Sequence, residues 1–91
     1  MGALMMTSAQ MRAARAMLGI DQRELAEQSG VSLPTIQRME ASDGNVRGLV
    51  ESLTRVVEAL NRAGIELIGD DMPSAAGGRG VRFRQSSRRA E

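Results

Sequence analysis

The side chains of this sequence that could do chemistry are guanidinium groups, carboxylates, amides and hydroxyls, because it contains no His, Cys, Trp or Tyr. The commonest general base, the commonest metal ligand and thiol chemistry are therefore missing. Asp70 and Asp71 are adjacent and could bind a cation, but no second cluster of ligands accompanies them, so a solvated turn is the simpler interpretation. We predict no enzyme activity, no metal site and no cofactor.

Recognition through hydrogen bonds is a different kind of chemistry, and a short run of residues is suited to it. Thr35, Gln37 and Arg38 are close in sequence and carry a hydroxyl, an amide and a forked guanidinium. Leu33 and Pro34 precede them and can offer only apolar contact. Such residues recognise a partner only if a rigid element presents them together.

Two short helices joined by a tight turn are predicted over Asp21–Glu40, DQRELAEQSGVSLPTIQRME. Asp21 can cap the first helix while Glu24 returns toward its backbone N–H, so this helix starts near Gln22. Gly30 follows the last periodic residue and can take the left-handed conformation that ends a helix.

The second helix is predicted over residues 33–41. Ser32 can cap it, and Pro34 is tolerated in its first turn. Ile36 and Met39 can face inward, which leaves the polar side chains at its start or on its outer face. This spacing of two helices is how a protein presents one helix to the major groove of DNA.

The run resembles the helix-turn-helix of the phage Cro and repressor-like family, also called the XRE family, small bacterial and phage transcription regulators. The resemblance covers about residues 7–64 and departs from the family at Ala41-Ser42, where Asn-Gly or Arg-Gly is frequent. The residues that carry it are Gln22, Glu24-Leu25-Ala26, Gly30-Val31-Ser32, Thr35-Ile36 and Glu40, preceded by a helix that ends in Leu18-Gly19.

The resemblance implies a mostly α fold with a four-helix lambda-repressor-like helix-turn-helix domain. After Gly64 the apolar residues alternate as they do in strands, which predicts a short C-terminal β-hairpin or pair of strands. The resemblance also implies a sequence-specific regulator of transcription that binds a palindromic operator in double-stranded DNA as a homodimer, through the major groove. Its own or a neighbouring promoter would be the target. The alternative is the antitoxin of a toxin–antitoxin pair, which autoregulates and binds a protein toxin. The arginine-rich C-terminus would suit a protein partner with an acidic surface.

The same resemblance assigns roles by position. The residues expected to contact bases are Leu33, Pro34, Thr35, Gln37 and Arg38. Those expected to contact the DNA backbone are Gln22, Ser32, Asn45 and Arg47. Arg38 can donate twice to guanine, whereas Leu33 and Pro34 suit a thymine methyl group. Simpler alternatives stay open: Ser32 as a helix cap, Gln37 and Arg47 as solvated residues, Arg38 paired with a local acid, and Leu33 packed on the neighbouring helix.

Arg15 and Glu40 are expected to form a partly buried ion pair that ties the motif to the first helix. This pair is structural and does not read DNA.

Domain organisation follows from the hydrophobic pattern. We expect a disordered leader at 1–6, the helix-turn-helix domain at 7–64, a strand element at 65–84 and a flexible basic tail at 85–91. Since a lone hairpin is marginal in water, pairing with a second subunit is predicted. The expected dimer interface consists of Ile65, Leu67, Val81 and Phe83. The alternative is a hairpin that covers one end of the bundle within a monomer.

The charge distribution argues against indiscriminate binding to nucleic acid. The chain of 91 residues has a net charge of +1. Residues 7–64 balance their Arg against their acidic residues, whereas residues 79–91 hold the excess of Arg. No apolar stretch approaches the length of a membrane span, so no membrane association is expected and the cytoplasm is the expected location.

Overall fold

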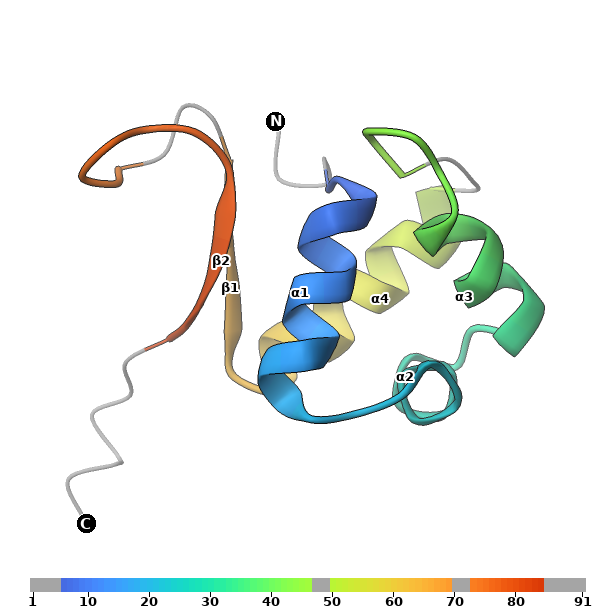
Figure 1. Cartoon of the computed structure of the whole chain (residues 1–91). Coiled ribbons are helices and arrows are strands. Elements are labelled where there is room, and N and C mark those ends of the chain that lie inside the picture. The colour runs from blue at the N-terminus through green and yellow to red at the C-terminus, as the bar shows by residue number, and fades with distance from the viewer. Residues whose placement is uncertain (1–5, 47–49, 70–72, 85–91) are drawn as a thin grey trace, which may run out of the picture.

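The computed structural model describes residues 6–46, 50–69 and 73–84. There the chain forms four helices followed by a two-stranded antiparallel sheet (Figure 1). The elements are α1 (Ser8–Leu18), α2 (Gln22–Ser29), α3 (Leu33–Glu40), α4 (Val50–Arg62), β1 (Ile65–Ile68) and β2 (Gly80–Phe83). The predicted fold class is therefore confirmed. Within the described ranges, no helix is long and apolar enough to cross a membrane.

The caps of α2 and α3 form as the sequence predicts. Asp21 accepts a hydrogen bond from the Glu24 N–H at 2.8 Å, and the Glu24 carboxylate accepts one from the Asp21 N–H at 2.9 Å. Gly30 ends α2 in the left-handed region, at a φ of 72°. Ser32 caps α3, which ends at Glu40, one residue before the predicted end.

The core lies where the four helices meet the hairpin. Its fully buried large side chains are Met6, Met11, Leu25, Ile36, Met39, Val56, Leu60 and Ile65. Two arginines of α4 join this helix to the C-terminal end of α2. Arg62 donates to the Gln28 carbonyl at 3.0 Å, and Arg55 donates to the Gly30 carbonyl at 3.4 Å. These bonds satisfy carbonyls that the end of a helix leaves without partners.

Met6 lies in the core, so the leader expected over residues 1–6 does not include it. Its side chain is only 1% exposed. Its carbonyl accepts from the Val46 N–H at 2.8 Å, and the Gly44 carbonyl accepts from the Ser8 N–H at 2.8 Å. The segment before α1 is thus paired with the loop after α3. Residues 1–5 and 85–91 lie outside the described residues.

The hairpin packs on the helices of its own chain. β1 contacts α4 and β2 contacts α1, on the side of these helices away from α2 and α3 (Figure 1). Ile65 pairs with Phe83 and Leu67 with Val81, so these four residues share one face. Ile65 is completely buried, whereas Leu67 and Val81 are partly buried against the core and Phe83 is 56% exposed. The expected dimer interface is corrected at Ile65, which has no surface left to offer to a second subunit.

Gln10 fastens α1 to the hairpin. Its amide nitrogen donates to the Ile68 carbonyl at 3.0 Å and to the Gly80 carbonyl at 2.9 Å. Its amide oxygen accepts from the Thr7 N–H at 2.9 Å, which completes the capping box of α1. One buried side chain thus joins a helix start to both strands.

Candidate nucleic-acid interface

The outer face of α3 carries the residues expected to contact bases. Ile36 and Met39 point into the core, being at most 1% exposed. Pro34, Gln37 and Arg38 are exposed on the other side of the helix, and Leu33 and Thr35 are half-buried. Packing of one face of α3 against α1 and α2 leaves the other face open. The structure therefore brings the five residues together on one helix at the edge of the domain (Figure 1).

Hydrogen bonds order the polar residues of this face. Arg38 Nη2 donates to Thr35 Oγ1 at 3.2 Å, and Ser32 Oγ donates to the same oxygen at 2.9 Å. The Thr35 N–H donates to Ser32 Oγ at 3.4 Å. Ser32 thus acts as a helix cap, and Arg38 is bonded to a hydroxyl instead of the local acid considered from the sequence.

The residues expected to contact the DNA backbone are in more varied surroundings. Gln22 donates through its amide nitrogen to Glu40 Oε1 at 3.0 Å, which uses one of its two amide hydrogens. Asn45 is exposed in the loop after α3, where it forms an isolated bridge with Thr7. Arg47 lies outside the described residues.

Glu40 is the centre of the network that joins α3 to α1 and α2. Arg15 donates through Nε to Glu40 Oε2 at 2.6 Å and through Nη2 to Glu40 Oε1 at 2.8 Å. The Glu40 side chain is 3% exposed and that of Arg15 is 21% exposed. The hydrogen bond to Glu40, with further attraction from the charges of Glu40 and Asp21, raises the pKa of Arg15 against the opposing effect of burial. The raised pKa keeps the Arg15 guanidinium charged where it is paired.

Some residues of this network were not expected from the sequence. Gln22 was assigned only to DNA, yet it also binds Glu40. Arg12 was assigned no role, yet its Nη1 donates to the Glu40 carbonyl at 2.6 Å. Gln10 could have been recognised, because Thr7 and Gln10 have the spacing of a capping box.

Among the described residues, no group of three His, Cys, Asp or Glu is placed so that it could hold a metal ion. Asp70 and Asp71 lie outside the described residues. What the interface offers is a set of donors and apolar groups held on a rigid helix.

One helix here supports a second, whose outer face carries a guanidinium, an amide and a hydroxyl, and this is the arrangement with which helix-turn-helix domains place a helix in the major groove of DNA. Comparison with known families agrees, since a helix-turn-helix family model matches residues 11–63. The chain belongs to the XRE family of helix-turn-helix proteins, which are DNA-binding regulators. No curated protein matches it.

Proposed function

We propose that the protein regulates transcription by binding a palindromic operator as a homodimer, with α3 of each subunit in the major groove, at its own or a neighbouring promoter. The exposed outer face of α3, with Gln37 and Arg38 beside the apolar Pro34, carries this proposal. Apolar and hydrogen-bonding groups on one helix can together distinguish base pairs by their major-groove edges.

Electrostatics supports selective binding over general attraction to DNA. Arg12, Arg15, Arg55 and Arg62 are each bonded to a carboxylate or a carbonyl of the domain. Arg15 and Arg55 are paired with carboxylates, whereas the partners of Arg12, Arg62 and Arg38 are neutral groups that leave the charge uncompensated. Residues 7–64 balance their Arg against their acidic residues, which supports contacts with a particular sequence over general attraction to phosphate.

Selection from a pool of random duplexes tests the proposal. We expect the purified protein to enrich one imperfect palindrome with half-sites about one helical turn apart, roughly 34–36 Å. Arg38→Ala should lose roughly 1–3 kcal/mol on that duplex and relax the preference at one base pair of each half-site. Enrichment of no sequence would contradict specific recognition.

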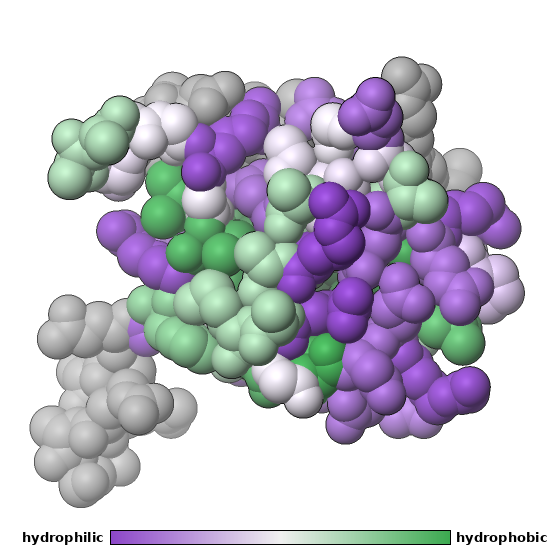
Figure 2. Space-filling model, viewed as in Figure 1, coloured by the Kyte–Doolittle hydropathy of each residue, from purple (hydrophilic) through white to green (hydrophobic). Residues whose placement is uncertain are grey.

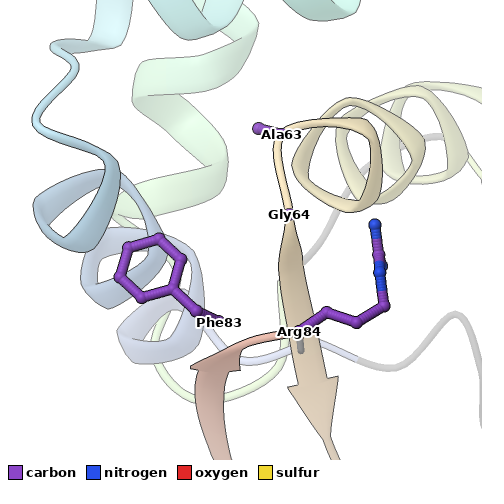
Figure 3. A pocket seen from close by; sticks show the side chains of 4 residues that line it. All are labelled: Ala63, Gly64, Phe83 and Arg84. Carbon is purple, nitrogen blue, oxygen red and sulfur yellow. The ribbon is translucent and has the colours of Figure 1, made fainter. Parts of the chain in front are cut away.

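The homodimer is proposed to form around Phe83, where the face of the hairpin that packs on the helices reaches the surface. Phe83 is 56% exposed there, beside a hollow of about 400 Å³ lined by Ala63, Gly64, Phe83 and Arg84. Figure 3 shows Phe83 and Arg84 leaving the end of β2 in different directions, with Phe83 on the side of α1. In Figure 2 the apolar surface gathers over α1 and the hairpin, whereas the side of α2 and α3 is mostly hydrophilic. An interface on this side leaves both recognition helices free.

Two matched substitutions test the dimer. Phe83→Ser removes the exposed aromatic ring of the hairpin, and Val50→Ser removes an exposed apolar residue, 66% exposed, at the start of α4. Light scattering should find the wild type and Val50→Ser dimeric and Phe83→Ser monomeric at the same concentration. A monomeric wild type, or a Phe83→Ser variant that stays dimeric, would contradict the proposed interface.

A further inference from the structure

Three polar residues spaced by three, Ser32, Thr35 and Arg38, form a connected chain of hydrogen bonds along the outer face of α3. Ser32 Oγ donates to Thr35 Oγ1 at 2.9 Å, and Arg38 Nη2 donates to the same oxygen at 3.2 Å. Residues three apart lie on the same face of a helix, so this chain runs along the surface available to DNA. Thr35 is its central member.

The hydrogen-bonding capacity of Thr35 is restricted by this arrangement. A hydroxyl has one O–H donor and two acceptor lone pairs. Ser32 and Arg38 each use one lone pair, which leaves the hydroxyl only its donor. Arg38 has donors and no acceptor. As held in the structure, the pair therefore presents donors alone.

We infer that Thr35 is a positioning residue that holds the Arg38 guanidinium for reading guanine. Guanine offers two neighbouring acceptors, O6 and N7, in the major groove. Adenine offers one acceptor, N7, beside an amino group that is itself a donor. That amino group would face the donors of Thr35 and Arg38, and no hydrogen bond could form between them. Orienting the long Arg38 side chain before DNA arrives also reduces the conformational entropy that binding would otherwise lose.

This inference rests on the proposed function, and a double-mutant cycle can separate the two. The probes are the duplex selected by the wild type and the same duplex with the guanine read by Arg38 replaced by adenine. That guanine is the position at which Arg38→Ala loses its preference. Thr35→Val removes the acceptor while keeping a β-branched side chain of similar shape, and Thr35→Ser keeps the hydroxyl.

We expect Arg38→Ala to reduce discrimination of guanine from adenine roughly 5- to 150-fold. Thr35→Val should reduce it about two- to tenfold, the range for one hydrogen bond, and Thr35→Ser should restore it. In the Arg38→Ala background, Thr35→Val should cause no further loss, because its effect passes through Arg38. Thermal melts of each variant check that the domain stays folded.

Other outcomes would overturn the inference in recognisable ways. In the double variant, the losses of guanine–adenine discrimination from Thr35→Val and Arg38→Ala could instead multiply. That result would mean that Thr35 reads a base by itself. Equal weakening on both duplexes, with the salt dependence reduced by about one phosphate contact, would make Thr35 a backbone contact. If the wild type selects no duplex, the proposed function fails first.

Discussion

Replacing Glu40 with Ala should destabilise the domain strongly, because one carboxylate joins three helices. It accepts two hydrogen bonds from Arg15 and one from Gln22, and its side chain is 3% exposed. Removing one partner of a buried ion pair costs about 3–5 kcal/mol. The Arg15 side chain is 21% exposed and keeps its hydrogen bond to the Ile20 carbonyl. Water can therefore solvate part of the Arg15 charge when Glu40 is absent. We therefore expect a loss of about 2–4 kcal/mol, or roughly 10–25 °C in melting temperature for a domain of this size.

Thermal melts followed by circular dichroism measure this effect, with Glu27→Ala as the control. Glu27 is exposed on α2, and its removal should change stability by no more than about 0.5 kcal/mol. Arg15→Ala should be at least as harmful as Glu40→Ala, since it leaves the more deeply buried charge without its main partner. The double variant Arg15→Ala, Glu40→Ala should lose less than the sum of the two. Equal small shifts for Glu40→Ala and Glu27→Ala would refute this account of the pair.

Gln10→Ala should destabilise the domain by roughly 1–3 kcal/mol in urea unfolding, because two strand carbonyls lose their donor; no change would show that water replaces it. The hydrogen bond from Arg82 lowers the pKa of Glu66. Stability from this pair should therefore be present above the unfolded pKa of Glu66 and be lost as the pH falls through the folded value. The difference in melting temperature between wild type and Glu66→Gln should accordingly shrink below about pH 4.3; a difference that persists at low pH would exclude the ion pair as its cause. Removal of residues 85–91, which include Arg88 and Arg89, should leave the dimer intact and make the salt dependence of DNA binding shallower if these arginines contact phosphate; an unchanged slope would exclude that contact.

The helices and their ends could be predicted because their signals are local. Asp21 and Glu24 satisfy each other's backbone N–H groups whatever the rest of the chain does, and Gly30 is suited to the left-handed turn by its lack of a Cβ. The outer face of α3 followed from helical periodicity once Ile36 and Met39 were assigned to the core. The bonds made by long polar side chains were harder to foresee. Gln10 and Gln22 have amides that suit many partners, and only the tertiary approach of the hairpin and of Glu40 selects the ones observed.

The hairpin shows why a strand pattern alone does not identify what covers the strands. Alternation placed Ile65, Leu67, Val81 and Phe83 on one face, and their register agrees with that. A period of two defines a face but not what covers it. The helices of the same chain bury Ile65, whereas its cross-strand partner Phe83 stays exposed. Truncation after Gly64 would therefore remove a core residue together with any interface, so a monomeric product could simply be unfolded. A substitution of Phe83 separates the two roles better than the truncation does, because Phe83 is 56% exposed whereas Ile65 is completely buried.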